Sequence, residues 1–397
     1  MEILSGILGL CVFVGILWLW SENRKEIKWK YPIILLAIML GIAFVFTRTT
    51  FGIAVGQGVA NFFDFLTKAA QEGIGFVFGG LGNVGEGGVF FLNVLMPILF
   101  ISVLVGILLK LGVMQFITKW LGKGISKISG TDDLLAYESI NSFVLSQTGI
   151  FVSAKEFINN LTERQIWSMA LMGNATISST IIGAYLQMLN PQYVITATLL
   201  NAIVGLLAVN IVFPESKDKE NELNNFDMEV AMKKPKGNVF QVISEYASTG
   251  FSVVVAIAVS LMAFVGLIGL LNNTFDLFTG MTFTKIMGMI FAPVAWLMGA
   301  GSDWINVGQL LATKLLSNEF VAIGSMGGMS LSTHANAIAS VAMLSFANLS
   351  CIGILYGGIA GVSKKQASVF MKKGFKIILV SFICSLITGT ITGLMMF

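Results

Sequence analysis

The sequence predicts an all-α polytopic membrane protein, with eight transmembrane helices, two re-entrant helical hairpins in an inverted repeat, and interfacial helices. Three observations carry this prediction. The chain of 397 residues is 55% hydrophobic and only 11% charged, whereas soluble domains carry charge on about a quarter of their residues. Long apolar runs recur along the chain, and two further apolar stretches are interrupted by polar residues. Lipid must therefore be the solvent for much of the surface.

Eight apolar runs approach or reach the length of about 17–25 residues that crosses a bilayer. The first run lacks a basic n-region and a cleavage site, so it is expected to be a retained helix rather than a signal peptide. Two of the runs, 166–188 and 335–355, have polar centres. The other six runs cover residues 3–20, 31–46, 89–109, 194–213, 252–271 and 377–396.

Basic residues set the expected orientation. With the loop 21–30 in the cytoplasm and the spans alternating, 18 of the 24 basic residues fall in cytoplasmic segments. Because cytoplasmic loops of membrane proteins are enriched in Lys and Arg, both termini are expected to face outward.

Two stretches, 132–162 and 286–324, are apolar in short halves separated by polar residues at 146–149 and 298–303. Each half is too short to cross, so each stretch is expected to be a re-entrant hairpin, whose irregular backbone must be satisfied by protein or water. A pair of interfacial helices is the alternative. Segments 51–70, 116–128 and 239–248 are amphipathic and expected at the interface, and 215–237 is expected to be a solvated loop.

The polar-centred spans match each other. Asn174 and Asn348 are each followed by a hydroxyl residue two positions later and by Gly nine positions later. The order of hairpin, polar-centred span and apolar span thus occurs twice, starting on opposite sides of the membrane. This inverted-topology repeat is typical of secondary transporters with a site near the midplane.

Glu319 lies deep in the second hairpin, where a carboxylate costs roughly 2.5–3.5 kcal/mol on insertion scales. It either pairs with Lys314 or binds a substrate or ion, and a carboxylate that accepts two hydrogen bonds suits a sugar diol. Gln147 and Thr148 at the first break could face a heterocycle edge or cap helices, and Asn348 with Ser350 could bind a ligand or join helices.

A small cation needs several oxygen ligands, some from unwound backbone. The hydroxyls of Ser142 and Thr176, with the carbonyls of Leu145 and Ile177, are the candidates, and ordinary helix packing is the alternative. Three scattered cysteines and His334 do not suggest a disulfide framework, zinc site or haem site. No nucleotide-hydrolysis motif occurs, so coupling to ATP is not expected.

Two motifs resemble the concentrative nucleoside transporter family. Residues 308–322 (GQLLATKLLSNEFVA) look like its second hairpin, and residues 345–353 (SFANLSCIG) look like its seventh span. The resemblance implies that Glu319, Asn348 and Cys351 bind ribose and that Gln147 and Thr148 bind the base. Ile181 would line the base pocket, and Phe346 and Gly149 complete the expected substrate-binding set.

The chain departs from the family's usual pattern at three positions. Gly149 stands where the family usually has Glu, and Cys351 where it usually has Ser. Ser142 replaces a common Asn at the sodium site, as in some proton-coupled members. The substrate and the coupling ion, Na⁺ or H⁺, are therefore left open.

The resemblance implies a bacterial cytoplasmic-membrane symporter that imports nucleosides by an elevator-type movement, forms homotrimers, and uses no organic cofactor or nucleic acid. The alternatives are a divergent member that carries a modified nucleoside or another polar solute, a membrane-embedded enzyme, and an ion channel. The expected units are a scaffold at 1–130, a first transport repeat at 131–213, a loop with a scaffold span at 214–271, and a second transport repeat at 272–397.

Overall fold

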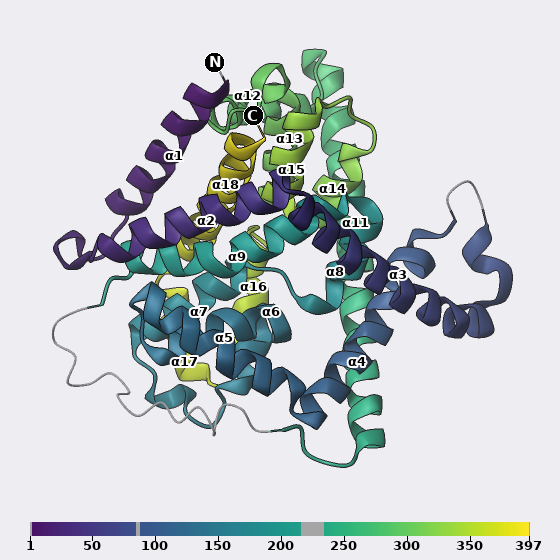
Figure 1. The fold of residues 1–397 in the computed structure, drawn as a ribbon. Coiled ribbons are helices and arrows are strands. Elements are labelled where there is room, and N and C mark those ends of the chain that lie inside the picture. The colour runs from purple at the N-terminus through teal and green to yellow at the C-terminus, as the bar shows by residue number, and fades with distance from the viewer. Residues whose placement is uncertain (1, 85–87, 216–233, 397) are drawn as a thin grey trace.

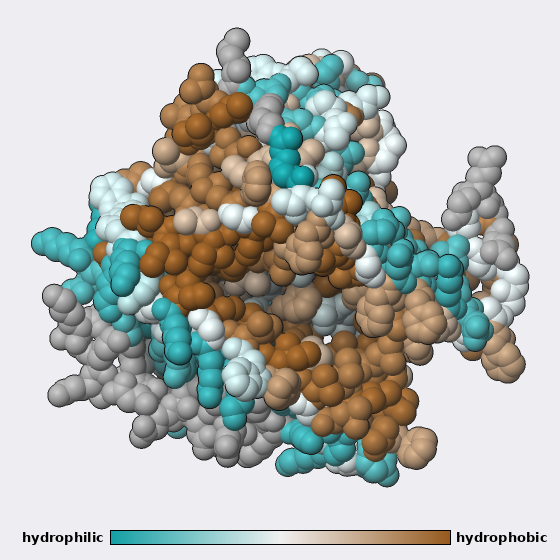
Figure 2. All heavy atoms as spheres, viewed as in Figure 1, coloured by the Kyte–Doolittle hydropathy of each residue, from teal (hydrophilic) through white to brown (hydrophobic). Residues whose placement is uncertain are grey.

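The computed structural model describes residues 2–84, 88–215 and 234–396, and this part of the chain is helical without strands (Figure 1). The two termini lie at the same end, where α1 packs beside α18. On the face drawn in Figure 2, hydrophobic side chains cover a broad area over α1 and α2, and hydrophilic ones gather at its edges and over α3.

Within the described residues, seven helical segments are long and apolar enough to cross a membrane, and each overlaps a predicted span. Six of them are α1 (Glu2–Leu19), α2 (Lys30–Arg48), the segment Phe91–Leu111 that contains α4 (Pro97–Leu111), α9 (Pro191–Val212), α11 (Val239–Thr279) and α18 (Gly374–Met395). The seventh, Glu163–Met188, consists of α7 (Glu163–Ala175) and α8 (Ile182–Met188) with a break between them. The predicted span 335–355 consists of two shorter helices, α15 (Thr333–Met343) and α16 (Cys351–Ala360).

The chain reverses inside α6 (Asp133–Ser153), at the predicted first break. Ser146 there has φ 81° and ψ 170°. Asn141 Nδ2 donates to Ser153 Oγ at 3.0 Å, whereas twelve residues of straight helix would separate them by roughly 18 Å. The two arms of α6 therefore lie side by side.

Ser146 occupies a backbone region that is almost exclusive to glycine and costs on the order of 1–3 kcal/mol. Ser146→Gly should therefore raise the thermal unfolding midpoint of the purified protein. The control is Ser368→Gly, on the exposed face of α17 (Lys364–Met371), which should lower the midpoint because glycine destabilises a helix interior. A lower midpoint for Ser146→Gly would show that Ser146 is not strained.

The second predicted hairpin contains two breaks. The predicted one, at 298–303, separates α12 (Phe283–Leu297) from α13 (Trp304–Leu316). An additional break at Ser317 and Asn318 precedes α14 (Glu319–Met326), and the Asn318 side chain caps α14 by accepting from Val321 N at 3.0 Å. This break makes Glu319 the first residue of a helix.

The breaks in the two polar-centred spans meet each other. Phe346 N, between α15 and α16, donates to Thr176 O, between α7 and α8, at 3.2 Å. Leu349 N donates to Leu315 O of α13 at 2.9 Å. The irregular segments of both halves of the chain are thus joined at one place.

Of the three predicted interfacial segments, two correspond to α3 (Thr50–Phe78) and α5 (Val113–Ser129). The prediction of a separate helix at 239–248 is wrong, because α11 runs unbroken from its capping box at Asn238 to Thr279. Gly250 does not interrupt α11. It allows close packing on α4, where a Cβ would lie 2.8 Å from Ser102 Cβ. Most of the predicted loop 215–237 lies outside the described residues.

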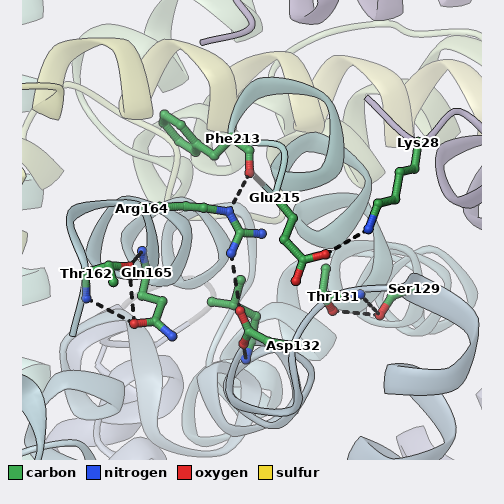
Figure 3. Close-up of polar contacts among 10 residues, drawn as sticks. Lys28, Ser129, Thr131, Asp132, Thr162, Arg164, Gln165, Phe213 and Glu215 are labelled. Atoms are coloured by element: carbon green, nitrogen blue, oxygen red, sulfur yellow. Dashed lines mark hydrogen bonds and ion pairs between the residues drawn. The ribbon is translucent and has the colours of Figure 1, made fainter. Parts of the chain in front are cut away.

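Polar contacts tie several elements together where α6 and α7 begin (Figure 3). Arg164 donates to Phe213 O at 3.0 Å and to Asp132 at 3.3 Å, and Lys28 pairs with Glu215 at 2.9 Å. At the same end Glu22 pairs with Lys373 and Lys376 of the α18 region. Burial raises the pKa of the Glu22 carboxyl, but the two lysines outweigh burial and hold this pKa below its usual value.

Candidate functional site

A cavity of about 290 Å³ lies where four breaks come together. They are the break in α6, the break before α14, and the breaks in the two polar-centred spans. This volume lies close to the lower end of the range for small-molecule pockets, ~300–1,000 Å³. Gly149 does not line it. The other seven residues predicted to bind substrate all line it, namely Gln147, Thr148, Ile181, Glu319, Phe346, Asn348 and Cys351.

The Glu319 carboxylate lines this cavity, and hydrogen bonds from its neighbours fix its orientation. Its side chain is 5% exposed, and it stands at the N-terminus of α14, where the helix dipole favours negative charge. Tyr185 Oη donates to Oε1 at 3.0 Å, and Asn348 Nδ2 donates to Oε2 at 3.4 Å. Ser350 in turn donates to Asn348 Oδ1 at 2.5 Å, which fixes the amide orientation. Each carboxylate oxygen keeps a lone pair for a further donor.

Gln147 also lines the cavity and begins the second arm of α6. Its Nε2 donates to Cys351 Sγ at 3.5 Å, while its Oε1 is buried without a hydrogen-bond partner. Cys351 Sγ donates to Phe346 O at 2.8 Å, so the thiol connects Gln147 to the break in the seventh predicted span. A buried acceptor left unpaired is costly unless a ligand or water satisfies it. The Gln147 oxygen is therefore suited to an N–H or O–H group of a ligand.

Of the four residues predicted to bind a cation, the fold brings Ser142 and Thr176 into contact. Thr176 Oγ1 donates to Ser142 Oγ at 3.3 Å, and both side chains are buried. Ile177 directly follows Thr176 in the break after α7, and Leu145 lies three residues after Ser142, next to the break of α6. The predicted alternative for Glu319, an ion pair with Lys314, does not occur in the described structure. Lys314 Nζ instead donates to Ala342 O, Ser345 Oγ and Ser385 Oγ.

Comparison with known proteins gives matches along nearly all of the chain. The family described as "Na+ dependent nucleoside transporter C-terminus" matches residues 193–393, and the corresponding N-terminus family matches residues 8–81. A "Nucleoside recognition" family matches residues 91–192 between them. The chain belongs to the concentrative nucleoside transporter family. It is a multi-pass membrane protein, and the matched relatives are transporters rather than enzymes.

Relatives and solved structures agree with this membership. The purine nucleoside transport protein NupG of Bacillus subtilis is 30% identical over 99% of both chains, and the nucleoside permease NupC of Helicobacter pylori is 26% identical over 98% of this chain and 97% of NupC. The structure of CNTnw in an inward-facing substrate-bound state has a TM-score of 0.93 at 27% identity and covers 100% of both chains. An outward-facing variant of CNTnw has a TM-score of 0.92 at 27% identity, covering 100% of this chain and 98% of that one.

Tyr185 does not line the cavity but contacts Glu319, and the sequence alone does not single it out. It is fully buried on α8, donates to Glu319, and stacks on Phe320 with ring centroids 4.9 Å apart. Its only signal in the sequence is a phenol inside a polar-centred span, which is too common a feature to single out a residue. Its role becomes visible once α8 is placed against α14.

Proposed function

We propose that this protein imports nucleosides by cation-coupled symport. The observation that carries the proposal is one cavity lined both by the Glu319 carboxylate and by Gln147, whose amide oxygen has no hydrogen-bond partner. Glu319, oriented by Tyr185 and Asn348, accepts from two ribose hydroxyls. The amide of Gln147, with Thr148 and Ile181 beside it, contacts the base. The names of the relatives NupG and NupC support the same substrate class.

We propose an elevator-type movement of the two repeats against a scaffold. The cavity is bounded on one side by the breaks and on the other by α4 and α11, through residues such as Val105 and Tyr246. A site at the boundary between two bodies can pass from one side of the membrane to the other when one body slides. The apolar window of α11 is only 6% buried within the chain. Such a surface suits lipid or further copies of the chain, and we propose that the protein forms a homotrimer.

The coupling cation, Na⁺ or H⁺, is proposed to act at Ser142, Leu145, Thr176 and Ile177. These residues lie at the breaks of α6 and after α7, so a cation bound there would order the segments that carry Gln147 and contact Phe346. We place the protein in the bacterial cytoplasmic membrane with both termini outside, because that orientation puts most basic residues in the cytoplasm.

A divergent substrate, such as a modified nucleoside, remains the second candidate. A Cβ at Gly149 would lie 2.8 Å from Leu145 Cβ, so the structure leaves no room there for the carboxylate common in the family without a shift of the chain. Calorimetric titration with uridine, cytidine, adenosine, inosine, ribose and free uracil tests both candidates. Competition among the nucleosides for one site supports ordinary nucleosides. Binding of none of them would contradict the proposal.

Cys351 offers a test of the ribose side of the site. Cys351→Ser should preserve or tighten uridine binding, because a hydroxyl forms stronger hydrogen bonds than a thiol of similar size. In a Cys11→Ser background, saturating uridine should also slow alkylation of Cys351, whereas Cys384, which does not line the cavity, should react at an unchanged rate. Equal alkylation of Cys351 with and without uridine would place the thiol outside the substrate site.

A further inference from the structure

Lys314 is a charged side chain that is 0% exposed inside the second repeat. Its Nζ donates to Ala342 O at 2.6 Å, Ser345 Oγ at 2.7 Å and Ser385 Oγ at 2.8 Å. These three oxygens match the three N–H groups of an ammonium. Among the described residues no carboxylate forms an ion pair with it. The three oxygen ligands and the ring of Phe382, whose centroid lies 6.0 Å from Nζ, compensate its burial.

The three acceptors lie in three different segments of the chain near the cavity. Ala342 is near the end of α15, Ser345 lies in the break that follows, and Ser385 is on α18. Ser345 and Ser385 are also hydrogen-bonded to each other at 2.6 Å. The same break carries Asn348, which orients Glu319. Lys314 therefore fixes the backbone from which part of the substrate site is built.

The first repeat has a candidate cation site at the corresponding place. Ser142 stands five residues before Gln147, and Lys314 stands five residues before Glu319, where Gln147 and Glu319 each follow a break and line the cavity. Ser142 contacts Thr176 in the break after α7, and Lys314 contacts Ser345 in the break after α15. Lys314 thus holds the break after α15 from the same sequence distance before a cavity residue as Ser142 has in the first repeat.

We propose that Lys314 is a positioning residue that acts as a built-in cation in the second repeat. An ammonium and an alkali ion both carry one positive charge and both take oxygen ligands. The break after α15 is then held permanently, whereas the break after α7 is ordered only when a transported cation binds. The inference rests on the proposed function, and it implies that one cation accompanies each nucleoside.

The test replaces the built-in cation with a free one. Lys314→Ser shortens the side chain and leaves space for an ion beside three oxygens, and Lys314→Met fills the space without charge. In choline chloride both variants should show a lower thermal unfolding midpoint, and a Kd for uridine weakened at least about tenfold. NaCl or KCl should restore Lys314→Ser towards wild type and should not restore Lys314→Met. The control Lys285→Met, at an exposed lysine of α12, should match wild type in every salt.

Two results would overturn the inference. One is a Lys314→Met protein with the wild-type midpoint and the wild-type Kd for uridine. The other is a Lys314→Ser protein that responds to NaCl and KCl no more than wild type does. If neither variant folds in any salt, the wild-type stoichiometry decides, because two cations per nucleoside would contradict a tethered second cation. The midpoints need no substrate, so they test the inference even if uridine does not bind wild type.

Discussion

Replacing Glu319 with glutamine should abolish measurable nucleoside binding. The carboxylate accepts from Tyr185 and Asn348 on different oxygens, so an amide would turn an N–H group towards one of these donors. Losing charge-assisted hydrogen bonds costs roughly 1.5–3 kcal/mol each, and two ribose hydroxyls would lose them together. Calorimetry on the purified variant measures the loss.

The matched control for this variant is Glu163→Gln. The Glu163 side chain is 47% exposed, pairs with Lys372 and does not line the cavity, so uridine affinity should not change. A Glu319→Gln protein that binds uridine with nearly wild-type affinity would remove Glu319 from the ribose site.

Replacing Gln147 with leucine should weaken binding of all nucleosides and flatten the preference among bases. The variant removes the buried, unpaired Oε1 atom, which in the complex would accept a hydrogen bond worth about 0.5–1.5 kcal/mol. The thermal midpoint should hold or rise, because an unsatisfied buried acceptor is lost with the amide. Titrations with uridine, adenosine and inosine measure the preference.

Gln57→Leu, at an exposed position of α3, controls for the added apolar side chain and should leave all three affinities unchanged. If Gln147→Leu ranks the three nucleosides as wild type does, with equal affinities, then Gln147 does not contact the base.

Apolar length predicted the spans well because lipid imposes it directly. The run 194–213, for example, corresponds to α9 (Pro191–Val212). The break at Ser146 was also predictable, because polar residues interrupt an apolar stretch there. The continuity of α11 was not predictable. The chain changes from amphipathic to apolar along this single helix, and composition cannot distinguish such a helix from two helices.

The parts of the site that were missed depend on contacts between distant segments. Tyr185 and Glu319 are 134 residues apart in the chain, and no local pattern links them. The sequence leaves open an ion pair between Lys314 and Glu319, which are five positions apart. Its actual ligands come from α15, the following break and α18, whose packing the sequence does not reveal. The motifs at 308–322 and 345–353 nevertheless contribute Glu319, Asn348 and Cys351 to the lining of the cavity.

Uptake of radiolabelled uridine and adenosine into proteoliposomes tests cation-coupled nucleoside import most directly. Purified protein is reconstituted, and an inward gradient of Na⁺ or of protons is imposed or collapsed with an ionophore. We expect accumulation above the external concentration with at least one of the two gradients, and loss of that accumulation when the gradient is collapsed or Glu319→Gln is used. Uptake no greater than in protein-free vesicles would contradict nucleoside import by this protein. Uptake that only reaches the external concentration, whatever cation gradient is imposed, would contradict cation coupling.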